Sequence, residues 1–407
     1  MLSLGGSISS QFVGRLSPIA APCAPGKCPR TQQDRSTRRA VSQPRANVLT
    51  RLLCGLTALF LVDGLLFRTN FYPSVIQPES YAGRFELTLW RDRREQSQSP
   101  NIVVTLGDSR FSYPPTVMDE QTRQTGYTFS HAGLAGSKPR DWYYMIRALD
   151  PTTRAYRAVM IGLDDFDDED QDDEERERLL DLRMVVNQLG LRDVFEFAWS
   201  YRTWPSRWDA FRGALLKGTV YRPDIAEFLS APRERLAKVK QYHEGWPQWT
   251  HDYVPEDRTL AGLSIDWTNW KAIYPPGVSA AEQESIDSIL LRRATPQTGS
   301  LADYRRHWLG AIIDRYKNSP TKIILVRLPR GPVVRPESLV KKLTSSIREL
   351  GRKKNVILVD EHRFDSLERP EFFKDALHLN REGASRFSIM LAQESRRLLG
   401  PPNGVPQ

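Results

Sequence analysis

The chain has few cysteines, and their absence from most of it excludes two kinds of structure. All three, Cys23, Cys28 and Cys54, lie within the first 54 of the 407 residues. The remaining part can hold neither a disulfide scaffold nor a zinc site built from thiolates. Cys54 does not fit a lipoprotein cysteine, which follows its apolar run, whereas here most of the run follows the cysteine.

Acidic residues are almost missing from the N-terminal region. Residues 1–51 contain eight Lys or Arg and one acid, so +7 of the chain's net charge of +9 lies there and only +2 remains for the rest. No basic patch with interleaved aromatic residues is left, which argues against a nucleic-acid partner. Because residues 1–50 are rich in Pro, Ser, Arg and Gln, we predict a disordered basic tail.

One long apolar run follows the tail. Leu52–Phe67 is almost wholly apolar and is bounded by Arg51 and Arg68. No small-x-small cleavage site follows it, so we predict a retained transmembrane anchor at residues 51–68. The preceding positive charges place the tail in the cytoplasm and the rest outside the cytoplasmic (inner) membrane, in the periplasm. A buried core helix is the alternative.

Asp63 is the ionisable residue inside this run. A charge in the hydrocarbon of a bilayer is costly and usually faces water or protein. We therefore expect Asp63 either near the outer interface or in contact with a transmembrane helix of a partner. Residues 69–98 follow as a juxtamembrane helix and linker, because large apolar residues recur there at helical spacing.

Apolar runs alternate with helical patterns in residues 99–407 and predict a parallel sheet. The predicted strands are residues 101–106, 126–131, 156–162, 322–328 and 356–360, and the predicted helices are residues 139–149, 301–316, 336–350 and about 381–398. We therefore predict a three-layer α/β fold, a parallel sheet of flavodoxin-like winding with a mainly helical insertion, preceded by one transmembrane helix.

The first predicted strand ends abruptly at Gly107-Asp108-Ser109. Open α/β sheets bind ligands at the carboxyl ends of their strands, and a serine nucleophile there needs a base held by a third group. His378 is the histidine that has an aspartate, Asp375, three residues before it. Ser109, Asp375 and His378 are therefore a candidate catalytic triad. The alternative is a helix N-cap turn at Ser109 and a buried core histidine at 378.

These two motifs resemble the first and last blocks of the SGNH (GDSL-type) hydrolase and acyltransferase superfamily. With an anchor ahead of the domain, the chain looks like the membrane-anchored SGNH-like proteins that serve the acylation of bacterial envelope polysaccharides. The resemblance covers about residues 99–164 and 320–400 of an SGNH-like domain at 99–407. It implies that Ser109, Asp375 and His378 are catalytic.

The resemblance also implies an oxyanion site. Gly136 falls on the oxyanion glycine of the second block, whereas His131 stands where the family has asparagine. Gly162 matches the glycine of the third block, but Asp164 replaces an asparagine whose amide helps to bind the oxyanion. An ionised carboxylate cannot donate a hydrogen bond, so Asp164 is expected to point elsewhere or to have a raised pKa. This departure favours a weak or altered catalyst.

The predicted insertion, residues 165–300, begins with an acidic run that we expect to be solvated, and its spacing fits no calcium loop, so no metal site is predicted. Its tryptophans form either a platform for sugar rings or, as we expect, the small core of the insertion. They are Trp199, Trp204, Trp208, Trp246, Trp249, Trp267 and Trp270.

Arg327 and Arg330, at the end of the strand predicted at 322–328, are candidates for binding an anionic substrate group or are surface residues. The resemblance implies acyl transfer through an acyl-serine without a cofactor. We therefore expect a serine esterase or O-acyltransferase, most simply for acetyl, that acts on an envelope or exported polysaccharide. A transferase would need an acyl donor from a multi-span membrane partner. The rival hypothesis is a non-catalytic SGNH-like subunit that binds glycan or scaffolds an export complex.

Overall fold

The computed structural model describes eight stretches of the chain. They are residues 44–69, 71–96, 99, 101–164, 180–245, 256–292, 302–336 and 346–402. Most of the predicted tail, the acidic run after Asp164, and Trp246 and Trp249 lie outside the described residues.

A sheet of five parallel strands forms the centre of the fold, as predicted. The strands are β1 (Ile102–Leu106), β2 (Thr128–His131), β3 (Ala158–Leu163), β6 (Lys322–Arg327) and β7 (Val356–Leu358). Their order, β2-β1-β3-β6-β7, is that of flavodoxin-like doubly wound sheets. β1 and β3 are buried along their whole length, which explains why they are nearly continuous apolar runs.

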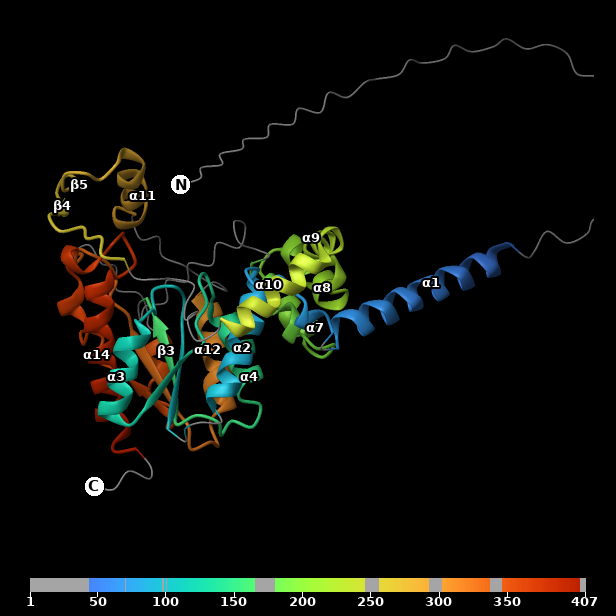
Figure 1. Ribbon diagram of the computed structural model, residues 1–407, viewed down its shortest axis with the longest axis horizontal. Coiled ribbons are helices and arrows are strands. Elements are labelled where there is room, and N and C mark those ends of the chain that lie inside the picture. Colours follow the sequence, from blue (N-terminus) through green and yellow to red (C-terminus); the bar gives the residue numbers. More distant parts are fainter. Residues whose placement is uncertain are drawn as a thin grey trace, which may run out of the picture. The chain divides into compact units, whose positions relative to one another are not determined.

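Helices cover both faces of the sheet and make three layers (Figure 1). α3 (Pro115–Thr125) and α14 (Arg381–Leu399) pack together on one face, and α4 (Pro139–Leu149) and α12 (Ala302–Arg315) on the other. Because neighbouring strand residues point to opposite faces, Val103 and Val104 belong to different apolar clusters. α13 (Ser346–Leu350) is the described part of the helix predicted at 336–350.

α2 (Tyr81–Gln96) is part of the fold and more than a linker. Phe85 and Leu89 on one side of the helix are buried, and Asp92 follows them on the same side. The buried carboxylate of Asp92 accepts hydrogen bonds from the hydroxyls of Ser130 and Tyr156, donors that a buried charge requires. The folded domain therefore begins before residue 99, the boundary predicted from the sequence.

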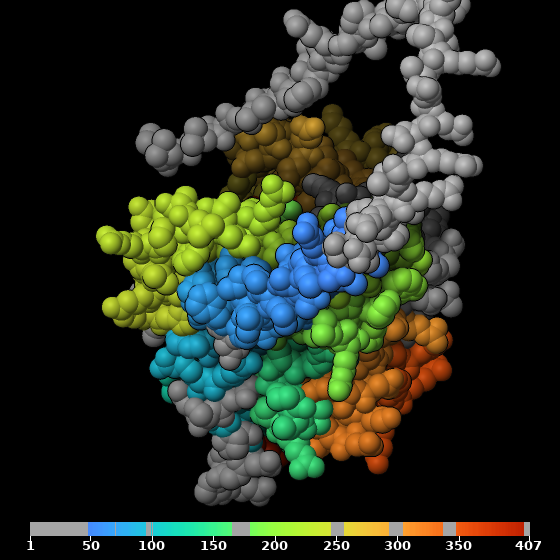
Figure 2. Space-filling model, turned by 90° about the vertical axis from the view of Figure 1, so that its right-hand side faces the viewer, coloured from blue at the N-terminus to red at the C-terminus, as the bar shows by residue number. Residues whose placement is uncertain are grey.

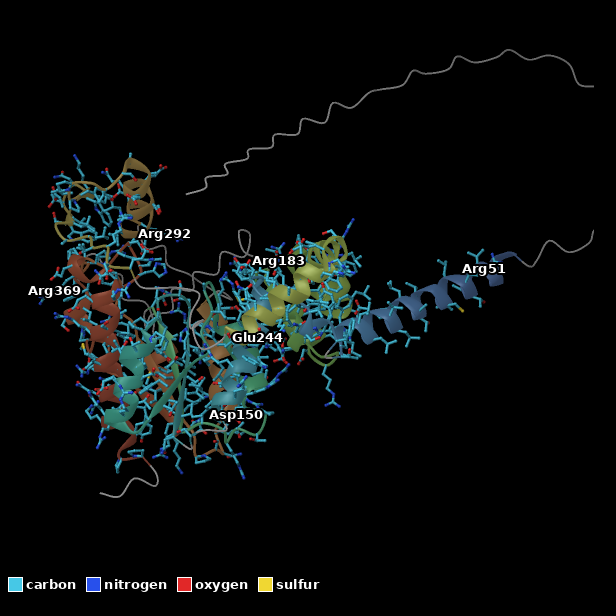
Figure 3. All side chains as sticks on the ribbon, viewed as in Figure 1. Arg51, Asp150, Arg183, Glu244, Arg292 and Arg369 are labelled. Atoms are coloured by element: carbon cyan, nitrogen blue, oxygen red, sulfur yellow. The ribbon has the colours of Figure 1, made fainter. Side chains whose placement is uncertain are left out.

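α1 (Pro44–Phe67) contains the predicted anchor. Within it, Val48–Phe67 is long and apolar enough to cross a membrane. Its apolar side chains point outward and most of them are exposed (Figure 3), so the alternative of a buried core helix is wrong. Residues 56–67 belong to the same compact unit as the chain that follows them.

The insertion is mainly helical, as predicted. Its described elements are α6 (Leu180–Val185), η2 (Val186–Gln188), α7 (Asp193–Trp199), α8 (Trp204–Leu215), α9 (Gly218–Ser230), α10 (Pro232–Glu244), the antiparallel pair β4 (Ser264–Asp266) and β5 (Lys271–Ile273), and α11 (Ala280–Leu290).

The last turns of α1 are bound by this insertion. Asp63 is buried and accepts hydrogen bonds from the backbone N–H groups of Lys217 at 3.2 Å and Gly218 at 2.8 Å. The carboxylate thereby satisfies N–H groups at the start of α9, where negative charge is also favoured by the helix dipole. The sequence suggested, as one of two alternatives, that Asp63 contacts a transmembrane helix of a partner. In the structure Asp63 contacts the start of α9 in the same chain.

Neighbouring residues extend the same contact. Arg68 donates to the carbonyl oxygens of Ala214 at 2.8 Å and Leu215 at 2.9 Å, which end α8. The ring of Phe67 packs against Tyr72, in the short helix η1 (Tyr72–Ser74), and against Tyr221 of α9. Both ends of the α8–α9 corner are therefore fastened to the end of the anchor.

The tryptophans of α7 and α8 do not form a core, contrary to expectation. Trp199, Trp204 and Trp208 are exposed, whereas the buried side of α8 is made of small residues such as Ala210 and Ala214. Trp267 and Trp270, at the β4–β5 hairpin, are partly buried and contact each other with ring centroids 5.7 Å apart.

Replacing Asp63 tests how firmly the anchor is joined to the fold. Asp63→Ala leaves the N–H groups at the start of α9 without their carboxylate, so we expect the free energy of unfolding to fall by about 1–2 kcal/mol. Thermal unfolding of the full chain in detergent measures this. Asp119→Ala, at an exposed position of α3, is the matched control and should have no effect. Equal melting temperatures for both variants would contradict the contact.

Candidate functional site

Ser109 lies in a tight turn immediately after β1. The N–H of Phe111 donates to the carbonyl of Asp108 at 3.0 Å, and α3 begins only at Pro115. The alternative that Ser109 caps a helix is therefore wrong. Only glycine fits at position 107, because a Cβ there would lie 2.8 Å from the Cβ of Phe111. The ring of Phe111 is buried beneath the turn.

Asp375 and His378 share a short loop between η7 (Pro370–Phe372) and α14. Phe373 and Leu379 form an antiparallel bridge at its base, and the N–H of Lys374 donates to the carbonyl of His378 at 3.0 Å. Figure 3 labels Arg369, shortly before this loop, and Asp150, before β3, at opposite ends of the sheet. The loop therefore lies at the edge where the strands end.

The structure brings the three predicted catalytic residues together. Ser109 Oγ is 2.8 Å from His378 Nε2, and His378 Nδ1 is 3.0 and 2.9 Å from the two carboxylate oxygens of Asp375. Because an ionised carboxylate only accepts hydrogen bonds, Nδ1 carries the proton and Nε2 accepts the Ser109 hydroxyl. The His378 side chain is 20% exposed, so it is not a buried core histidine.

The loop also fixes the carboxylate of Asp375. Its Oδ1 accepts the backbone N–H groups of Leu377 and His378, both at 2.8 Å. Burial opposes ionisation, but the hydrogen bond and charge of His378 and these backbone donors outweigh it and hold the pKa of Asp375 below its ordinary value. Asp375 is therefore ionised at neutral pH and able to orient the imidazole.

The loop of residues 132–138, which carries Gly136, folds against the Ser109 turn. The carbonyl of Gly107 accepts hydrogen bonds from the N–H of Leu134 at 3.2 Å and from the hydroxyl of Ser137 at 3.0 Å. Gly136 has a φ of +73°, in the left-handed region that favours glycine. The first two sequence blocks are thus neighbours in space.

His131 and Gly162 lie under the site and support it. The imidazole Nδ1 of His131 is 3.1 Å from Thr105 Oγ1 in a buried cluster. At Gly162, near the end of β3, a Cβ would lie 2.5 Å from the ring of Phe111. Gly107 and Gly162 are therefore both needed to seat the same phenylalanine.

Asp164 points to two arginines. Its Oδ1 is 2.8 Å from an Nη of Arg305 in α12, and its Oδ2 is 3.7 Å from an Nη of Arg110. Arg110 directly follows Ser109 and also contacts Asp108, at 2.5 Å. Burial opposes the charge on Arg110, but Asp108 and Asp164 outweigh it and raise the pKa of Arg110 above its ordinary value. Asp164 thus belongs to a cluster of two carboxylates and two guanidinium groups.

Sequence reasoning missed this cluster because its members come from distant segments. Arg110 could have been suspected from the sequence, since it directly follows the candidate nucleophile Ser109. Arg305 could not, because it is one of several arginines in a helical pattern and its contact with Asp164 spans 141 positions.

Arg327 and Arg330, the predicted candidates for binding an anionic group, are both paired with carboxylates of this chain. Arg327 is buried, and its Nη1 is 2.6 Å from Glu368, which Arg330 also contacts at 3.0 Å. Arg327 bonds Asp365 as well. Asp365 lies in η6 (Asp365–Leu367), so these arginines fasten the segment before the Asp375–His378 loop to the end of β6.

No protein-family model matches the sequence, and a search of curated proteins finds no relative. Within the described residues, no three or more His, Cys, Asp or Glu side chains are grouped closely enough to hold a metal ion. The groups of the site that can take part in chemistry are Ser109, His378, Asp375 and the charged cluster beside them.

A double-mutant cycle tests the contact between Asp164 and Arg305. Asp164→Asn takes a carboxylate away from a nearly buried guanidinium, and Arg305→Gln does the converse, so each should destabilise the fold. We expect the double variant to cost about 1–2 kcal/mol less than the two single costs together. Chemical denaturation of the full chain in detergent measures all three.

The exposed pair of Asp314 and Lys353, 2.6 Å apart, is the matched control and should show a smaller coupling. Fully additive costs at Asp164 and Arg305 would mean that the two charges do not interact.

Proposed function

We propose that this chain is a membrane-anchored serine esterase or O-acyltransferase of the SGNH type that acts on acyl groups, most simply acetyl, of an envelope or exported polysaccharide. The observation that carries the proposal is the continuous hydrogen-bonded series from Ser109 Oγ through His378 to Asp375. A serine, an imidazole and an ionised carboxylate in this order are the components of nucleophilic acyl transfer.

The reaction begins with the attack of Ser109 Oγ on the ester carbonyl, while His378 Nε2 takes the hydroxyl proton. The tetrahedral intermediate then expels the alcohol, which receives that proton from His378, and an acyl-serine remains. Water or a sugar hydroxyl next gives its proton to His378 and attacks the acyl-serine. The second tetrahedral intermediate expels Ser109 Oγ, which takes that proton back from His378, and an acid or a new ester is released. Asp375 holds the imidazole throughout and stabilises its positive charge.

The oxyanion of the intermediate would be bound by backbone N–H groups of Ser109 and Gly136. The hydrogen bonds that hold the 132–138 loop against Gly107 support this assignment. A lone carboxylate at Asp164 would repel the oxyanion, but Arg305 and Arg110 offset its charge. Asp164 therefore does not argue against catalysis as strongly as the sequence alone suggested.

The predicted anchor supports the proposed substrate class. A domain held on the outer side of the cytoplasmic membrane by α1 would meet polymers as they are exported, and the basic residues before α1 favour this orientation. As an esterase the domain would use water, and as a transferase it would take its acyl group from a multi-span membrane partner.

Labelling with a fluorophosphonate tests the nucleophile. The full chain in detergent should react at one serine, and Ser109→Ala should abolish the label. Ser288→Ala, at an exposed serine of α11, is the matched control and should label fully. If wild type and Ser109→Ala both remain unlabelled, the result favours the rival hypothesis of a non-catalytic subunit that binds glycan or acts as a scaffold.

The rate of labelling tests the other two residues. His378→Ala removes the base, and Asp375→Asn favours the wrong tautomer, so each should slow labelling by roughly 10²–10⁴-fold. His362 offers a matched control, because it is another histidine whose Nδ1 lies close to an aspartate three positions away, 2.7 Å from Asp365, and its side chain is exposed. His362→Ala should label at the wild-type rate, and equal slowing by all three variants would point to a general loss of structure.

A further inference from the structure

The strongest feature outside the site is an exposed aromatic surface on α7 and α8, which we call the aromatic face. It consists of Phe195 and Trp199 from α7 and Trp204 and Trp208 from α8, together with Phe211 of α8, which is partly buried. Consecutive rings touch: the centroids of Phe195 and Phe211 are 5.7 Å apart, those of Trp208 and Phe211 5.9 Å, and those of Trp199 and Trp204 6.4 Å.

The aromatic face is large for a surface in water. The three tryptophans are 52%, 64% and 53% exposed and Phe195 is 65% exposed, which amounts to on the order of 400 Å² of aromatic surface. This is in the range of patches that mark an interaction site on a soluble protein. The opposite side of α8, with Ala210 and Ala214, is the side that packs on the fold.

We propose that the aromatic face lies in the interfacial layer of the membrane in which α1 is anchored, so that the domain is held against the bilayer by this surface as well as by its helix. The occupant of the face is lipid, at the level of the headgroups and the first carbons of the acyl chains. This proposal does not depend on the catalytic function.

The position of the α8–α9 corner along the axis of α1 supports the placement of the aromatic face at the membrane interface. Asp63, which binds the start of α9, lies one turn before the end of α1, about 6 Å along the helix axis. Arg68, directly after the apolar segment, binds the end of α8. The α8–α9 corner is therefore fixed at the depth where the apolar segment meets the polar region.

The figures agree with this placement. α7, α8 and α9 gather at the end of α1 rather than over the sheet (Figure 1). Figure 2, which looks onto this side, shows the green and yellow-green residues of the insertion around the blue helix. α8 leads away from its contact with Arg68, and Trp208 is about 10 Å from that end of the helix.

The composition of the face is that of membrane interfaces. Tryptophan gathers there because its ring is apolar and its N–H is polar. Arg202, Arg207 and Arg212 lie among the tryptophans, and arginine side chains can lay their apolar stems along such a surface while their guanidinium groups reach lipid phosphates.

Quenching of tryptophan fluorescence by brominated lipid tests the proposal. The full chain would be reconstituted into nanodiscs of phosphatidylcholine and phosphatidylglycerol, with bromine near the headgroup end or near the methyl end of the acyl chain. α1 contains no tryptophan, so quenching has to come from the folded part. Three of ten tryptophans belong to the face, so shallow bromine should remove up to about three tenths of the emission if all ten emit equally, and deep bromine less.

The combined variant Trp199→Phe, Trp204→Phe, Trp208→Phe keeps the face aromatic and should lose most of this quenching. Trp267→Phe with Trp270→Phe, at the β4–β5 hairpin, is the matched control and should retain it. The single variants Trp204→Phe and Trp208→Phe serve if the combined variant does not fold. Absence of quenching, or equal quenching in wild type and the combined variant, would overturn the proposal and leave the face to a protein partner or a second copy.

Discussion

The common direction of the five strands is the constraint on which the site depends. Because β1, β2, β3 and β6 all run the same way, the segments that follow them meet at one edge of the sheet. There Ser109, which directly follows β1, comes within hydrogen-bond distance of His378, 269 positions further along the chain. Asp164 and the loop of Gly136 reach the same edge for the same reason. The charged cluster and the proposed oxyanion donors are therefore consequences of the winding of the sheet.

Much of this arrangement was predictable, because buried parallel strands have to be apolar throughout and leave a strong local pattern. The strands and α4 follow from such local patterns. The triad was also accessible, since Ser109 and His378 lie where two elements end or begin. Ion pairs between distant segments were not: Arg327 at a strand end looks the same in the sequence whether it faces water or, as here, buried Glu368.

The tryptophans of the insertion show a different limit. Large aromatic residues usually fill cores, so the seven were expected to form one. α8 instead packs through small residues such as Ala210 and Gly213, which let it approach its neighbours closely, and leaves Trp204 and Trp208 outside. In this helix the small residues face the fold and the large aromatic residues face outward, which is the reverse of the usual arrangement. Hydrophobic spacing identifies the two sides, but only the contacts of the neighbouring helices decide which one faces inward.

The buried carboxylate of Asp92 has a consequence for a chain that α1 is predicted to anchor in a membrane. A soluble, shed form produced by cleavage between α2 and β1 would leave the hydroxyls of Ser130 and Tyr156 without the carboxylate of Asp92. It would also remove Phe85 from the apolar cluster that includes residues of β1 and β3. Cleavage before α2 would also separate Phe67 and Asp63 from the insertion, which would lose their contacts with Tyr221 and Gly218. Release of an intact domain by proteolysis is therefore disfavoured by the way the fold incorporates its own tether.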